Sequence, residues 1–219
     1  MKVIIPAKSN SNRVKNKNYR NFHNNDSLVD ILIKKLLRIF KPSDIYLSCD
    51  EDKSFFEIKY NIKFILRDKK LCDNDVAMGE VISSIVKQME LEDDEIIMWA
   101  LVTDPFFFDY RECVDCWNIL NKDKYDSLGV LYEHKGYVLD YMFNPINCGF
   151  ADNHIPTQYI KPVYKLNNTL FIASVKTILE KKYYLGERPF WLVNNGFTID
   201  IDSEYEFKLS QKLYGYLYG

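Results

Sequence analysis

Short apolar runs alternate with amphipathic stretches along most of this chain. Apolar residues that recur three or four positions apart predict helices, and short unbroken apolar runs between them predict strands, some buried on both faces. The helices are expected at 28–40, 76–89, 110–120 and 175–182, with a last one after residue 203. The strands are expected at 3–5, 44–50, 63–67, 95–102, 126–132, 170–173, 191–193 and 197–202. The alternation predicts an α/β fold with a doubly wound, mostly parallel sheet in one domain, residues 1–219.

This alternation is interrupted over about 133–169. Glycine and proline recur there with aromatic residues between them, at Gly136, Pro145, Gly149, Pro156 and Pro162. The stretch is too long for a simple connection within a compact domain. We therefore expect an arm with short strands that protrudes from the domain.

A cationic loop follows the first predicted strand. The charged residues from 8 to 20 are all cations, namely Lys8, Arg13, Lys15, Lys17 and Arg20. Small residues (Ser9, Asn10 and Ser11) let backbone N–H groups approach an anion closely. Because a loop after a buried strand lies at the carboxyl edge of the sheet, it predicts a site for a phosphate-rich ligand. The loop contains no glycine, so it is neither a P-loop nor a dinucleotide-binding loop. A basic surface loop that touches RNA is the alternative.

Two carboxylates lie near the end of the chain, in the predicted strand 197–202. A period of two puts Asp200 and Asp202 on one face while Ile201 faces the core. Neighbouring carboxylates repel, and a shared cation relieves this, so both are candidate Mg²⁺ ligands. The alternative is that Asp202 only favours the N-terminus of the following helix and Asp200 is solvated. Asp104, beside Pro105, is interpreted as a cap of the helix after it and less readily as a further metal ligand.

Composition narrows the classes of partner. The formal charge of −2 argues against a general nucleic-acid binder, so the basic loop is a local feature. The 16 Tyr and 14 Phe are spread along the chain, which is typical of packing and not of base stacking. No apolar run approaches the roughly 20 residues that span a bilayer, so no membrane partner is expected.

The cysteines indicate a reducing compartment. They are scattered at Cys49, Cys72, Cys113, Cys116 and Cys148, with no signal peptide before them. We interpret them as reduced and the protein as cytoplasmic. The sequence has no second pair of cysteines or histidines that could complete a zinc site with Cys113 and Cys116, so buried thiols are favoured over zinc.

The opening stretch Val3–Asn18 (VIIPAKSNSNRVKNKN) resembles the I-I-P-A-R-x-G-S-K-R-x-x-x-K-N opening of the acylneuraminate cytidylyltransferase family, the CMP-sialic acid synthetases and their relatives. Later stretches are similar to family motifs in the same order, so the likeness spans nearly the whole chain. These are Arg67 with Leu71, Trp99–Phe106, Thr157-Gln158 with Asn167, and Asp200-Ile201-Asp202 with Glu204.

The resemblance implies a nucleotide-diphospho-sugar transferase-like fold whose arm forms a homodimer. It also implies a reaction in which CTP and a small acid bearing a hydroxyl, of the sialic or nonulosonic type, give a CMP conjugate and pyrophosphate for surface glycan synthesis. The matching positions are Lys8, Arg13 and Lys17 for catalysis; Pro6, Ala7, Ser9, Asn10, Asn18 and Arg67 for the nucleotide; Asp200 and Asp202 for Mg²⁺; and Leu101, Gln158 and Asn167 for the acceptor.

This chain departs from the family pattern at several of these positions. Lys8 stands in place of arginine, Asn10 in place of glycine, and Leu101 in place of glutamine. A lysine cannot grip phosphate with two parallel hydrogen bonds as arginine does. Two other hypotheses therefore stay open. One is a glycosyltransferase that uses the D-x-D pair to hold a metal and a nucleotide sugar, and the other is a degenerate, non-catalytic nucleotide- or RNA-binding protein.

Overall fold

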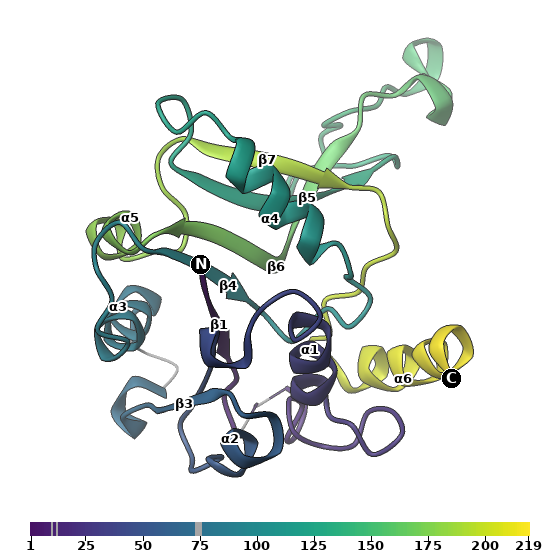
Figure 1. Ribbon diagram of the computed structural model, residues 1–219. Helices are drawn as coiled ribbons and strands as arrows, with labels where there is room; N and C mark the ends of the chain where they lie inside the picture. Colours follow the sequence, from purple (N-terminus) through teal and green to yellow (C-terminus); the bar gives the residue numbers. More distant parts are fainter. Residues whose placement is uncertain (10, 12, 73–75) are drawn as a thin grey trace.

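The computed structural model describes residues 1–9, 11, 13–72 and 76–219, and within them seven strands form one sheet (Figure 1). Their order is β3-β2-β1-β4-β6-β5-β7. Neighbouring strands are parallel except that β6 is antiparallel to both β4 and β5, which confirms the mostly parallel α/β sheet. The strands are β1 (Lys2–Pro6), β2 (Ile45–Cys49), β3 (Lys63–Leu66), β4 (Ile96–Ala100), β5 (Ser127–His134), β6 (Val163–Ser174) and β7 (Pro189–Asn194).

Helices cover both faces of the sheet, as expected for a doubly wound fold. Alternate residues of β1 enter two different cores, Val3 and Ile5 on one face and Ile4 on the other. The first core contains buried residues of α1, α2, α4 and α6, and the second contains those of α3 and α5. The α-helices are α1 (Leu28–Leu36), α2 (Phe55–Tyr60), α3 (Met78–Gln88), α4 (Tyr110–Ile119), α5 (Val175–Lys181) and α6 (Glu204–Tyr218). Short 3₁₀ turns occur at η1 (Pro42–Asp44), η2 (Lys69–Cys72), η3 (Ala151–Asn153) and η4 (Thr157–Tyr159).

Two helices begin with a capping box. Ser27 Oγ accepts the Asp30 N–H (3.2 Å), and the Asp30 carboxylate accepts the Ser27 N–H (2.8 Å) at the start of α1. Ser203 and Glu206 make the same reciprocal pair at the start of α6, with distances of 3.2 and 2.8 Å. Each box satisfies backbone N–H groups that have no partner inside the helix, so these polar residues fix where the helices begin.

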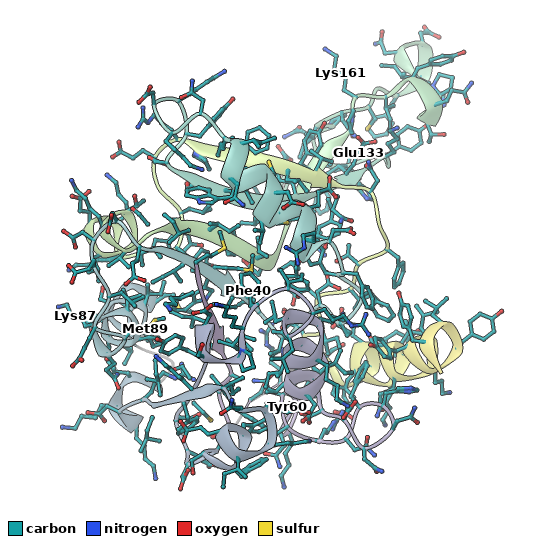
Figure 2. The ribbon with its side chains drawn as sticks, in the orientation of Figure 1. Phe40, Tyr60, Lys87, Met89, Glu133 and Lys161 are labelled. Carbon is teal, nitrogen blue, oxygen red and sulfur yellow. The ribbon has the colours of Figure 1, made fainter. Side chains whose placement is uncertain are left out.

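The arm protrudes from the end of the sheet where β5 and β6 extend past their neighbours (Figure 1). Glu133 and Lys161, on the segments that lead into and out of it, lie on the arm side, away from Phe40 and Tyr60 (Figure 2). The Asn147 amide joins the two sides by donating to the carbonyls of Gly136 (2.9 Å) and Lys161 (3.1 Å). The predicted protrusion is therefore present.

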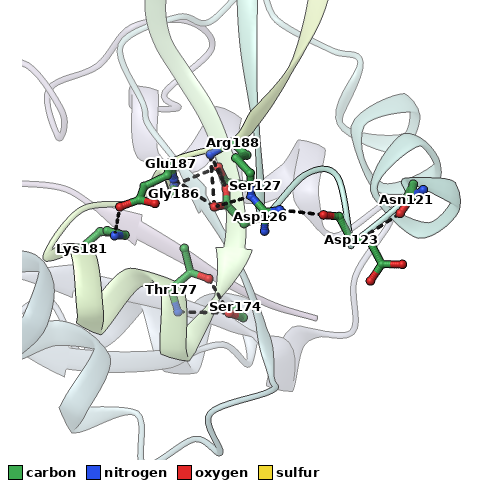
Figure 3. Close-up of polar contacts among 10 residues, drawn as sticks. All are labelled: Asn121, Asp123, Asp126, Ser127, Ser174, Thr177, Lys181, Gly186, Glu187 and Arg188. Carbon is green, nitrogen blue, oxygen red and sulfur yellow. Dashed lines mark hydrogen bonds and ion pairs between the residues drawn. The ribbon is translucent and has the colours of Figure 1, made fainter.

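The start of β5 is tied to the chain that leads into β7. The Asp126 carboxylate accepts the backbone N–H groups of Glu187 and Arg188, each at 3.0 Å, and Ser127 Oγ accepts that of Gly186 at 2.9 Å (Figure 3). The same view shows Ser174 Oγ accepting the Thr177 N–H (3.1 Å) at the start of α5. The bonds made by Asp126 and Ser127 hold the start of β7 beside β5 at the sheet edge. From β7 the chain continues to the two C-terminal aspartates.

The predicted strand 197–202 is not a strand. The segment follows β7 in an extended course, but its backbone makes one bond to the sheet region, from the Ile201 N–H to the Thr103 carbonyl (3.0 Å). Both edges of β4 are already taken by β1 and β6, so no ladder is open to it there. The predicted alternation of side chains holds at 200–202, where Ile201 is fully buried between two partly exposed aspartates, but not at the start of the segment, where Phe197 is exposed and Thr198 bonds the buried Asp104.

The described cysteine side chains (Cys49, Cys113, Cys116 and Cys148) are free thiols, as expected. Burial raises the pKa of both Cys113 and Cys116, so their thiols stay protonated. None of the helices in the described residues is long and apolar enough to cross a membrane.

Candidate active site

The cationic loop and the C-terminal aspartates meet at the carboxyl edge of the sheet. Lys17 Nζ donates to the Ile201 carbonyl and lies 3.5 Å from Asp202 Oδ1. Arg13 Nη2 lies 2.8 Å from the same oxygen. The loop leaves β1 at the centre of the sheet, and buried Ile201 anchors the aspartate segment to the first core. Two parts of the chain about 185 residues apart therefore form one charged cluster.

Lys17 is held in this cluster by burial. Only 7% of the residue is exposed, and burial lowers the pKa of its ammonium group while Asp202 and Asp200 oppose that shift. A buried ammonium group has little water to screen it, so its charge acts strongly on a neighbouring anion. Lys17 is therefore suited to neutralise a phosphate that enters the cluster.

Hydrogen bonds close the two ends of the loop on each other. The Asn18 side-chain amide donates to the Lys8 carbonyl (2.9 Å), and the Tyr19 hydroxyl donates to the Ala7 carbonyl (2.8 Å). The Ala7 N–H in turn donates to the Ser48 carbonyl, which continues the pairing of β1 with β2 beyond Pro6. The loop base is thus rigidly attached to the sheet. Asn10 lies outside the described residues.

Ser9 is engaged by a carboxylate of the protein itself. Its backbone N–H lies 2.6 Å from Asp50 Oδ1, and its hydroxyl lies 2.9 Å from Asp50 Oδ2. Burial by itself raises the pKa of Asp50, but the hydrogen bonds from Ser9 outweigh burial and hold this pKa below its ordinary value. The Ser9 donors that the sequence assigned to an anion are therefore occupied by Asp50, which directly follows β2. The sequence shows a carboxylate at the end of the predicted strand 44–50, but it does not show that Ser9 is the partner of this carboxylate.

Arg67 emerges directly after β3, with its backbone N–H bonded to the Cys49 carbonyl (2.7 Å). Only 7% of the residue is exposed, yet Nε and Nη2 of its guanidinium have no hydrogen-bond partner among the described residues. A buried guanidinium with unpaired N–H groups is costly, since water is excluded and no acceptor replaces it. This arrangement suits an acceptor supplied by a bound ligand.

The predicted acceptor-site residues do not join the cluster by any hydrogen bond or ion pair in the described part of the chain. Leu101 follows β4 and is half-buried, with its backbone N–H bonded to the Thr169 carbonyl (3.0 Å). Gln158 is exposed in η4 on the arm. Asn167 lies in β6, and its side chain is outside the described set.

Asp104 does not cap α4, contrary to its interpretation from the sequence. That helix begins at Tyr110 with Asp109 at the N-cap position. Asp104 Oδ1 accepts the Phe106 N–H (3.1 Å) in a turn directly after β4, and Oδ2 faces hydroxyl groups of other segments.

Asp200 and Asp202 are the residues whose chemistry fits Mg²⁺. Both are partly exposed and flank the buried Ile201, and Mg²⁺ is commonly held by one or two carboxylates together with substrate phosphates and waters. No group of three or more His, Cys, Asp or Glu side chains gathers as a complete metal site in the part of the chain described. The pair therefore fits a metal that is shared with a bound triphosphate.

The sequence profile of a family described as cytidylyltransferase matches residues 2–140. The chain belongs to the cytidylyltransferase family. The matched region contains the cationic loop, Arg67 and the central strand β4, so the family expected from the opening stretch is confirmed.

One curated relative of this cytidylyltransferase is a CMP-N,N'-diacetyllegionaminic acid synthase from Legionella pneumophila. The two are 39% identical over 54 residues, which are 24% of this chain and 23% of that protein. The match therefore spans about a quarter of the relative's length.

Solved structures align over nearly the whole chain. A CMP:2-keto-3-deoxy-manno-octonic acid synthetase complexed with CTP gives a TM-score of 0.62 at 12% identity and covers 97% of both chains. A putative glucose-1-phosphate thymidylyltransferase from Bacillus anthracis, in complex with sucrose, gives 0.66 at 12% identity and covers 98% of this chain and 95% of the other. The nucleotidyltransferase-like fold is thereby confirmed.

Proposed function

We propose that this cytidylyltransferase transfers CMP from CTP to a hydroxyl group of an acidic sugar and releases pyrophosphate. The observation that supports this most strongly is the meeting of Lys17 and Arg13 with Asp202 at the carboxyl edge of the sheet. The cluster has the cations and carboxylates that a metal-bound triphosphate requires. The similarity to a CMP-N,N'-diacetyllegionaminic acid synthase supports a nonulosonic acid as the acceptor.

The chain's own cations supply most of the chemistry in this proposal. Attack on the α-phosphate increases negative charge on its non-bridging oxygens and on the leaving pyrophosphate, and fixed positive groups stabilise that charge. Lys17 lies nearest the reacting phosphate, while Arg13 and Lys8 neutralise the pyrophosphate. The product forms directly, with no covalent enzyme intermediate.

The unpaired guanidinium of Arg67 is assigned to the nucleotide. Its buried Nε and Nη2 need acceptors, and CTP offers phosphate and carbonyl oxygens. Pro6, Ala7 and Asn18, in the base of the loop, are also assigned to the nucleotide, and Ser9 joins them if the nucleotide displaces or shares Asp50.

Asp200 and Asp202 would hold Mg²⁺ in this site. The metal supplies positive charge that neutralises the triphosphate when it is bound. Asp202 Oδ1 already contacts Arg13 and Lys17, so its second oxygen and Asp200 are the donors that remain for a metal among the residues described.

The acceptor half of the site is assigned to Leu101, Gln158 and Asn167, with the arm forming a homodimer. Exposed apolar side chains on the arm support association with a second copy, since such residues rarely gather on a free surface. They include Tyr141, Met142, Phe143, Ile146 and Phe150.

Pyrophosphate release tests the proposal. The protein is incubated with CTP, Mg²⁺ and a panel of sialic, legionaminic and pseudaminic-type acids, and release is expected with at least one acid and only when CTP is present. Hydrolysis of a UDP-sugar without use of CTP would instead support the D-x-D glycosyltransferase. A thermal shift by CTP without turnover of any acid would support a degenerate nucleotide-binding protein.

A further inference from the structure

A buried carboxylate joins four separate segments behind the aspartate pair. Asp104, only 2% exposed, accepts at Oδ2 the hydroxyls of Thr198 (2.6 Å), Tyr132 (3.0 Å) and Thr169 (3.3 Å). Oδ1 accepts the Phe106 N–H (3.1 Å). We call these five residues the Asp104 junction. Its four donors leave the carboxylate hydrogen-bonded at both oxygens.

The three hydroxyls come from positions that border the proposed site. Tyr132 lies in β5 directly before the arm, and Thr169 lies in β6 where the arm ends. Thr198 lies in the extended segment two residues before Asp200. The junction therefore connects the end of β4 and the base of the arm with the segment that carries Asp200 and Asp202.

This connection matters because the other polar contacts described above for the aspartate segment act at its C-terminal end, on Ile201 and Asp202. The segment is not part of the sheet, and its backbone is bonded to the sheet region through Ile201 and Thr103. The bond from the Thr198 hydroxyl to a buried carboxylate restrains the opposite end of the segment from Asp202 and the Ser203 cap. Hydrogen bonds to charged groups are stronger than those between neutral groups, particularly where water is excluded.

We propose that Asp104 is a positioning residue that, through the Thr198 hydroxyl, holds Asp200 and Asp202 at the distance from the cationic loop that metal binding requires. The proposal rests on the metal role given to these two aspartates in the proposed function. Asp104 itself is enclosed by its donors and does not touch the ligand. Its effect reaches the site through the backbone from 198 to 202.

The turn after Asp104 is held by hydrogen bonds from a lysine of α1. Lys35, on α1, donates to the carbonyls of Pro105 and Phe107, the latter at 2.9 Å. Its ammonium also lies 3.7 Å from the centre of the Phe108 ring. Lys35 therefore restrains the turn that follows Asp104 independently of Thr198.

A matched pair of substitutions at Thr198 tests the proposal. Thr198→Val keeps the side-chain shape but removes the hydroxyl, whereas Thr198→Ser keeps the hydroxyl. Thr198→Val is expected to raise the Mg²⁺ concentration for half-maximal pyrophosphate release roughly tenfold, as expected for loss of one charge-assisted hydrogen bond. The rate at saturating Mg²⁺ should change much less, and Thr198→Ser should behave like the unsubstituted protein.

Binding of Mn²⁺ alone, measured by electron paramagnetic resonance without nucleotide, gives a readout that does not depend on turnover. Thr198→Val is expected to bind Mn²⁺ several-fold more weakly than Thr198→Ser, with thermal unfolding confirming that both variants are folded. Equal Mn²⁺ affinity in the two variants, or no binding by either, overturns the positioning role. If no acid supports pyrophosphate release in any variant, the proposed function fails, while the Mn²⁺ comparison still decides the role of Asp104.

Discussion

Lys17 is the residue on which the proposed chemistry depends most directly. Lys17→Ala is expected to lower turnover by several orders of magnitude, because it removes the buried charge beside Asp202. The matched control is Lys15→Ala, which removes an exposed lysine of the same loop and should leave the rate within a fewfold. Steady-state kinetics on both variants would check this, and equal rates would remove Lys17 from the mechanism. The free energy of unfolding should fall by only about 1 kcal/mol, because the Ile201 carbonyl loses its donor.

Lys35 gives a second prediction at the residue scale, for the pH dependence of stability. Burial lowers its pKa to about 7, with Arg38 acting in the same direction and Asp104 opposing. The unfolded chain, whose lysines titrate near pH 10.4, then binds more protons than the folded chain between these values. The free energy of unfolding should therefore rise with pH from about 7 to 10, by at most about 1.4 kcal/mol per pH unit. In Lys35→Met, this part of the rise should be absent from urea unfolding curves measured across that range. A rise of the same size in both proteins would contradict the pKa shift.

At the scale of elements, the capping box of α6 has two roles. The Glu206 carboxylate accepts the N–H groups of both Ser203 (2.8 Å) and Asp202 (2.9 Å), so the helix start also holds one of the proposed metal ligands. Ser203→Ala is expected to destabilise the protein by about 1 kcal/mol, the usual effect of losing an N-cap side chain. Ser203→Asp, which caps equally well, should restore stability. Chemical denaturation checks both, and equal destabilisation by the two variants would argue against the cap.

Most elements were predictable because their periodicity is local. The buried strands and long amphipathic helices are visible in the sequence itself, whereas α2, at Phe55–Tyr60, is too short for a helical repeat to be recognised. The alternation over 197–202 gave the correct side-chain burial at 200–202 but the wrong element. A strand also needs a free partner edge, and β4 has none to offer.

In the candidate site, too, some contacts could be predicted from the sequence and others could not. The approach of Lys17 to Asp202 was predictable, because residues at the carboxyl edge of one sheet meet there whatever their separation in the chain. The bond between Ser9 and Asp50, the unpaired guanidinium of Arg67 and the Asp104 junction were not, since each depends on which tertiary neighbours are present or missing.

At the scale of the whole molecule, the role proposed for the arm predicts the oligomeric state of the protein. Phe143 is an 81% exposed residue of the arm, and an exposed apolar ring is stabilised when a second copy covers it. Phe143→Glu is expected to shift a dimer to the monomer in light scattering, because burying the new carboxylate in the interface would be unfavourable. The matched control is Ile58→Glu on α2, a residue 91% exposed and distant from the arm, which should leave the mass unchanged. If the acceptor half of the site is completed by the partner's arm, the Phe143→Glu monomer should still be stabilised by CTP while it loses acid-dependent pyrophosphate release. A protein that is monomeric before substitution, or a Phe143→Glu dimer with full activity, would contradict the role of the arm and leave a site completed within one chain.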